Sequence, residues 1–202
     1  MNTIKLRLQQ VVITSAFFCC FAFNFPPPGK ESVAKSKGSA GAVNDSVNIK
    51  ANIVAFLRWY KTNLNKAASF PLLSKDSQDY FMVNRKACTA YLAFLKSSKY
   101  ISTKYIGYWQ RYFDDKAADL KKEKIRSDVP EGFDMDFVLI TQEPELILDA
   151  IDSLKLTVVS MNRTMAVIGV ILPSDTTVDY EFEMAKTKQG WQINYISTQN
   201  FD

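Results

Sequence analysis

The spacing of apolar side chains changes once along this chain, from a helical period to a strand period. Between residues 49 and 112 apolar residues recur every three or four positions, which is typical of amphipathic helices. After Pro130 and Gly132 apolar and polar residues alternate, which is typical of strands with one buried face. Helices first and an antiparallel meander afterwards is the layout of an α+β fold.

Three helices are predicted in the first part. Asp45 and Ser46 are expected to cap the first helix. Its apolar face is expected to comprise Ile49, Ile53, Phe56, Leu57, Tyr60 and Leu64. The second helix is predicted over 85–96, and the third from Ser102 to about residue 126. The segment 67–79 contains proline, serine and aspartate and is predicted to be a loop or a broken turn.

Four strands are predicted to follow, and they span 154–161, 165–172, 178–184 and 191–195. The second of them is apolar on both faces, which favours a central strand covered on both sides. A hairpin turn is expected over 173–176. Upstream, 133–141 is predicted to be a short strand or an extended segment, and 143–151 a helical turn.

The first residues are typical of a secretory leader. Lys5 and Arg7 precede an apolar run over 11–25 that is short for a membrane span, and residues 1–22 are predicted to be a signal peptide. The alternatives are an uncleaved anchor and a lipoprotein acylated at Cys19 or Cys20. We therefore expect an exported protein, periplasmic or at the cell surface, that contacts a membrane only through such an anchor.

A tether and a single domain are predicted after the leader. Residues 23–46 are rich in Pro, Gly, Ser and Lys and are expected to be a flexible linker. Residues 47–202 are expected to form one α+β domain, which is long enough to bury its own core.

The composition excludes several kinds of chemistry within these 202 residues. There is no histidine, so a Ser-His-Asp triad, a Cys-His dyad and a histidine-ligated metal site are all excluded. No glycine-rich phosphate loop or dinucleotide motif is present, and no cofactor is implied. The formal net charge is +4, and loss of the leader removes two basic residues, which argues against nucleic acid as a partner.

Three segments resemble the ketosteroid-isomerase-like superfamily, also called nuclear-transport-factor-2-like or cystatin-like, and within it a group of exported bacterial domains. They are IVAFLRWYKTN at 53–63, DMDFVLITQE at 134–143 and GWQINYI at 190–196. The resemblance implies N-terminal helices packed on the concave face of a curved antiparallel sheet that forms a cone. Phe137 stands where those domains tend to have proline, and 67–100 has no counterpart. The superfamily contains enzymes, ligand binders and assembly modules, so it leaves the function open.

Asp134 and Asp136 form an acidic pair with one residue between them. On an extended strand both side chains would face the same side, where they would supply part of a cation site. A single carboxylate in an apolar cone would also serve as a proton-shuttling base, as the resemblance to isomerases implies. The alternative is that both are exposed turn acids. Gln142 is expected to bind backbone near the sheet edge or to join the site.

Aromatic residues supply the remaining candidates for a ligand-binding site. Tyrosine and tryptophan combine an apolar body with one polar tip, which suits pockets for sugars or flat rings. The candidates are Tyr60, Tyr91, Tyr105, Trp109 and Trp191, together with Asp134, Asp136 and Gln142. The alternative is that these rings pack the helices onto the sheet.

The preferred hypothesis is a non-catalytic exported module that binds a small molecule or a partner protein. The alternatives are a carboxylate-based enzyme, such as an isomerase, lyase or hydrolase, and an inhibitor or immunity protein. The identity of the ligand and the oligomeric state, including a homodimer, stay open at this point.

Overall fold

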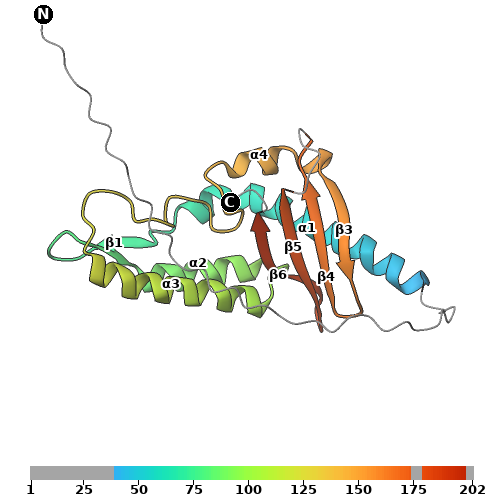
Figure 1. The fold of residues 1–202 in the computed structure, drawn as a ribbon, viewed down its shortest axis with the longest axis horizontal. Coiled ribbons are helices and arrows are strands. Elements are labelled where there is room, and N and C mark those ends of the chain that lie inside the picture. The colour runs from blue at the N-terminus through green and yellow to red at the C-terminus, as the bar shows by residue number, and fades with distance from the viewer. Residues whose placement is uncertain (1–38, 174–178, 199–202) are drawn as a thin grey trace, which may run out of the picture. The chain divides into compact units, whose positions relative to one another are not determined.

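The computed structural model describes residues 39–173 and 179–198, with side chains from Asn44 onward (Figure 1). The helices are α1 (Ser39–Ala68), α2 (Arg85–Ser97), α3 (Thr103–Glu123), α4 (Pro144–Asp149) and the short 3-10 helix η1 (Ile151–Ser153). The strands are β1 (Leu73–Lys75), β2 (Phe81–Val83), β3 (Lys155–Met161), β4 (Met165–Ile171), β5 (Tyr180–Thr187) and β6 (Gly190–Thr198). None of the helices in this part of the chain is both long and apolar enough to cross a bilayer.

The strands form two antiparallel sheets. A four-stranded sheet has the order β3-β4-β5-β6, and β1 and β2 form a separate hairpin. In β4, Ala166, Ile168 and Val170 are buried on one face, and Val167 and Ile171 are half-buried on the other. This α+β architecture with a late antiparallel meander confirms the predicted class.

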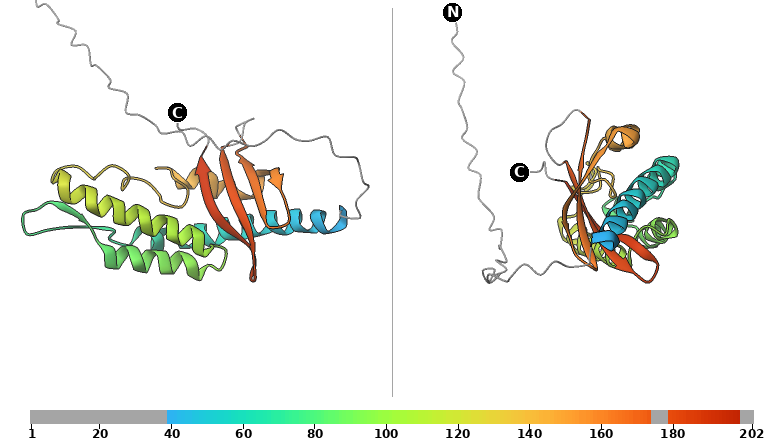
Figure 2. Two further views of the ribbon diagram at one scale, coloured as in Figure 1. Left: turned by 60° about the horizontal axis from the view of Figure 1, so that its bottom comes forward. Right: turned by 90° about the vertical axis from the view of Figure 1, so that its right-hand side faces the viewer.

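Helix α1 crosses one face of the four-stranded sheet (Figures 1 and 2). Its 30 residues give it a length of about 45 Å. Most of the predicted apolar face is confirmed, because Ile49, Ile53, Phe56, Leu57 and Tyr60 are fully buried, whereas Leu64 is only partly buried. Helix and sheet thus share one core, and removal of α1 would expose it.

The start of α1 corrects two predictions. The helix begins at Ser39, so residues 39–46 are helical and do not belong to a flexible tether. Asp45 does not cap the helix. It lies within α1, and its carboxylate accepts hydrogen bonds from Lys186 Nζ at 2.8 Å and from Trp191 Nε1 at 3.1 Å. The predicted signal peptide at 1–22 and the rest of the tether lie outside the described residues.

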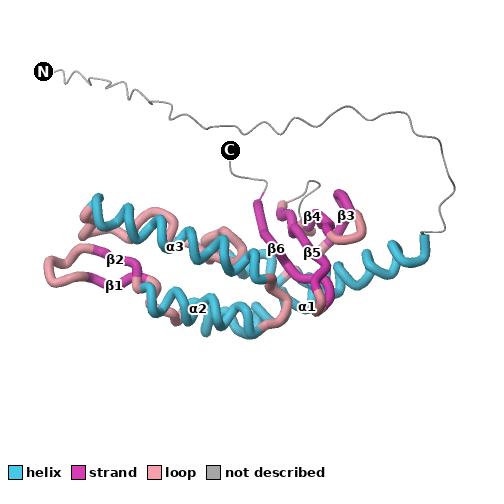
Figure 3. Tube along the Cα trace, turned by 90° about the horizontal axis from the view of Figure 1, so that it is seen from below, coloured by secondary structure: helices cyan, strands magenta, loops and turns pink. Residues whose placement is uncertain are grey.

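Helices α2 and α3 lie side by side and extend past β6 (Figure 3). The Asn84 side chain caps α2 by accepting from Ala87 N, and Ser102 caps α3 by accepting from Tyr105 N. Both predicted helices are confirmed. The second helix matches within one residue, and the third ends at Glu123, before the predicted end.

Two connecting segments differ from the prediction. The segment 67–79 contains β1, which pairs with β2 because Asp76 Oδ1 accepts from the amides of Gln78 and Tyr80 and closes the turn between them. The segment 133–141 is not a strand, and α4 lies within the predicted helical turn at 143–151. Most of the predicted hairpin turn at 173–176 lies outside the described residues.

Candidate functional site

A cavity of about 680 Å³ lies between the C-terminal half of α1, the start of the β1 segment, α2 and the loop that precedes α4. Its walls are mainly apolar and aromatic. The apolar side chains that matter below are Leu64 on α1, Phe70 after it, and Phe133 and Phe137 in the loop. A cavity of this size falls in the range of small-molecule sites, which is about 300–1,000 Å³.

Five of the eight sequence-predicted residues line this cavity, and they are Tyr60, Tyr91, Asp134, Asp136 and Gln142. Tyr60 comes from α1, Tyr91 from α2 and the other three from the loop, so segments distant in sequence converge here. Burial raises the pKa of Tyr60 and of Tyr91 well above the ordinary value, so both phenols stay protonated. The cavity therefore has two neutral tyrosines in its wall.

Asp136 organises the loop from within. Its Oδ2 accepts a hydrogen bond from the Tyr60 hydroxyl, and its Oδ1 accepts from the amides of Val138 at 3.0 Å and Leu139 at 2.7 Å. Its own amide donates to the Thr141 carbonyl at 2.8 Å, which closes a tight turn. Ile140 completes this turn in the left-handed backbone region, with φ of 51°.

The electrostatics of Asp136 follow from its burial. Loss of solvent raises the pKa of this carboxyl, while the hydrogen bonds from Tyr60 and the two amides act in the opposite direction. The negative charge of Glu145, the second residue of α4, raises it further. Both oxygens of Asp136 already have donors, so this carboxylate holds the loop against α1.

Asp134 has a more exposed environment than Asp136. It is exposed, and its Oδ2 accepts a hydrogen bond from Gln142 Nε2 at 2.9 Å. Residues 134–136 do not belong to a strand, as the prediction assumed, but both acids line the same cavity. No group of three or more His, Cys, Asp or Glu side chains in the described part of the chain is placed to hold a metal ion.

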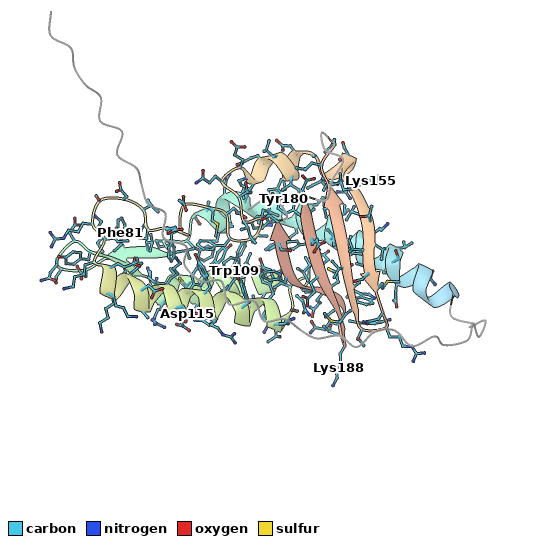
Figure 4. All side chains as sticks on the ribbon, in the orientation of Figure 1. Phe81, Trp109, Asp115, Lys155, Tyr180 and Lys188 are labelled. Carbon is cyan, nitrogen blue, oxygen red and sulfur yellow. The ribbon has the colours of Figure 1, made fainter. Side chains whose placement is uncertain are left out.

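Tyr105 and Trp109 lie in the core behind the cavity and do not line it. Trp109 packs edge-on against Phe137, with ring centres 5.3 Å apart, so Phe137 joins the cavity wall to the core. The Tyr105 hydroxyl and Trp109 Nε1 are buried with no hydrogen-bond partner among the described residues. Both rings belong to the hydrophobic core, which fits the packing interpretation; Figure 4 labels Trp109.

Trp191 lies away from the cavity and fixes α1 to the end of the sheet. Its Nε1 donates to Asp45, its carbonyl accepts from Asn52 Nδ2 at 2.9 Å, and Lys186 Nζ lies 5.6 Å from its ring centre. Trp191 is thus one of the predicted site residues that do not line the cavity.

The cavity is also lined by residues that were not predicted from the sequence, among them the aromatic pair Phe133 and Phe137 and the acid Glu145. The two phenylalanines flank the Asp134–Asp136 pair at a spacing of four residues, and that spacing was the available signal. Glu145 gives no such signal, because an acid in the first turn of a helix is common.

Comparisons with protein-family models, with curated proteins and with solved structures find no match for this chain.

Proposed function

We propose that this protein is a non-catalytic binding module that takes up a small molecule with an apolar body. The observation that carries this proposal is the cavity of about 680 Å³, with its aromatic wall and a few polar groups. Leu64, Phe70, Phe133 and Phe137 offer apolar contact area, and Tyr60 and Tyr91 add polar tips. In this proposal the protein binds or carries its ligand and leaves it chemically unchanged.

Catalysis by a carboxylate is the second candidate, and Asp136 in the cavity wall is the observation in its favour. A general base needs an oxygen that can reach a substrate proton. In Asp136 the hydroxyl of Tyr60 occupies one oxygen and two backbone amides occupy the other. Three of its about four acceptor positions are therefore filled, which supports binding over an isomerase, lyase or hydrolase reaction.

We also propose that the domain is a variant of the ketosteroid-isomerase-like cone and that it works after export. The position of α1 across one face of an antiparallel sheet supports the first point. The course of α2 and α3 past β6 is the departure from that plan. The basic and apolar sequence at 1–22 supports the second point.

Binding of N-phenyl-1-naphthylamine tests the proposed function. This dye is uncharged at neutral pH and fluoresces strongly only in apolar surroundings. We expect the protein to enhance its fluorescence, and Leu64→Trp, which fills the cavity, to remove most of the enhancement. Val47→Trp is the matched control, because Val47 is an exposed apolar residue on the same helix. An enhancement that is absent, or equal in both variants, would contradict the proposal.

A further inference from the structure

The charged groups of the cavity all have one sign. Asp134, Asp136 and Glu145 line it, and no Lys or Arg is among the described residues that do. Lys66 adjoins the wall from outside, with Nζ 5.3 Å from the Phe70 ring centre. An anionic ligand would enter this cavity against three carboxylates.

The three acids differ in what they have left to offer a ligand. Asp136 is engaged by Tyr60 and by two amides, so it has little capacity for a further donor. Asp134 is exposed, and its side chain is hydrogen-bonded only to the neutral Gln142 among the described residues. Glu145 is also exposed, and no ion pair joins it to a described cation. Two carboxylates at the cavity therefore form no ion pair with any cation in the described part of the chain.

The aromatic wall of the cavity also favours a ligand that carries a positive charge. Aromatic faces attract cations as well as apolar groups, and Phe70 already accepts the Lys66 ammonium on its ring. Phe133 and Phe137 lie in the same loop as Asp134, so an apolar body that contacts these rings would carry its polar end close to this acid.

Resting on the proposed function, we propose that the ligand of this cavity carries a basic group, an amine or guanidine that is protonated at neutral pH, on an apolar body. The body lies against Phe133 and Phe137, and the cationic group faces Asp134 and Glu145. The cavity is thus selective for cationic amphiphilic molecules over neutral and anionic ones of the same shape.

Three probes that share one phenylbutyl body test this selectivity. They are 4-phenylbutylamine, 4-phenylbutan-1-ol and 4-phenylbutanoate, and each competes with N-phenyl-1-naphthylamine on the full chain. We expect the amine to bind about tenfold more tightly than the alcohol at low salt, as charge-assisted hydrogen bonds would give. The carboxylate should bind most weakly, and the difference between amine and alcohol should shrink as salt rises.

Matched charge variants locate the selectivity. Asp134→Asn with Glu145→Gln should make the amine and the alcohol bind with equal affinity. Asp115→Asn with Glu123→Gln removes the same charges from exposed positions on α3, away from the cavity, and should preserve the preference.

The outcomes separate the two proposals. Equal binding of amine and alcohol, a preference for the carboxylate, or failure of all three probes to displace the dye would overturn the basic-group proposal and leave the binding function in place. Loss of the amine preference in the α3 variant would also overturn it. Failure of the dye itself to bind would overturn the proposed function.

Discussion

Two aspartates fix α1 at its two ends, and they do so in opposite electrostatic settings. Near the start of the helix, Asp45 accepts from the Lys186 ammonium and from Trp191 Nε1. Near its end, Tyr60 donates to Asp136, which also accepts from two backbone amides. The hydrogen bond from Lys186 lowers the pKa of Asp45, whereas burial raises that of Asp136. Both carboxylates accept a hydrogen bond from an aromatic side chain, so that bond does not explain the difference. The Lys186 cation at Asp45 and the loss of solvent at Asp136 decide whether each pKa falls or rises.

The largest expected effect is that of Asp136→Ala. The change leaves the Tyr60 hydroxyl and the amides of Val138 and Leu139 without their acceptor, and we expect the free energy of unfolding to fall by about 3 kcal/mol. Urea unfolding measures this loss. Asp115→Ala on the exposed face of α3 (Figure 4) is the control, and it should change stability by less than about 0.5 kcal/mol. A loss below that of the control would show that Asp136 does not hold the loop.

Tyr60→Phe should have a smaller effect, because it removes one hydrogen bond and keeps the ring in the core. We expect a loss of about 1 kcal/mol in the free energy of unfolding. The pKa of Asp136 should rise further, because the Tyr60 hydroxyl stabilises the charged carboxylate. NMR titration of the carboxyl carbons measures this shift. A fall in that pKa would mean that the hydrogen bond favours the neutral acid.

The two aspartates should respond to pH with opposite signs. Asp136 binds its proton more tightly in the folded protein, so its contribution to stability is complete below pH 3.8, the ordinary value, and declines as the pH rises through the folded pKa. Asp45 contributes above pH 3.8, and its contribution declines as the pH falls through its lowered pKa. Urea unfolding of Asp45→Asn and Asp136→Asn between pH 2.5 and 7 should therefore show differences from wild type with opposite slopes. Equal slopes would contradict the assignment.

Asp45→Asn should have the smallest effect near neutral pH. The amide oxygen can still accept from Trp191 Nε1, and only the charge opposite Lys186 is lost. We expect a decrease in stability smaller than that of Tyr60→Phe, and we expect it to diminish at high salt, since the pair is close to solvent. Thermal unfolding at low and high salt measures this dependence, and a salt-independent loss would point to packing as the cause.

The periodic elements were predictable because their signal is local. The apolar face of α1 and the alternation in β5 each depend on residues within a few turns or positions of one another. The hairpin of β1 and β2 was missed, because strands of three residues are too short to show a period. For the same reason the pattern at 133–141, only nine residues long, did not separate a strand from a turn.

The candidate site was predictable as a set of residue types and not as a set of partners. Tyr60 and Asp136 were both selected, but they are 76 residues apart in sequence, and nothing local indicates that they pair. Asp45 was predicted to be a helix cap from its local sequence, because its actual partner Lys186 lies 141 residues away and leaves no local signal. Tyr105 carries the same side chain as the cavity residues Tyr60 and Tyr91, and only the tertiary structure separates it, with Trp109 and Trp191, from the cavity.

The positions of these two contacts of α1 in the sequence also limit the order in which the protein can fold. The contacts of Asp45 close a loop of more than 140 residues, whereas those of α2 with α3 are much closer in sequence. During synthesis the start of α1 therefore cannot form these contacts until the hairpin of β5 and β6 has been made. Folds with such long-range closures form more slowly than those with local contacts, and they leave apolar surface uncovered for longer. For this chain that surface is the face of α1 that carries Ile49 and Ile53.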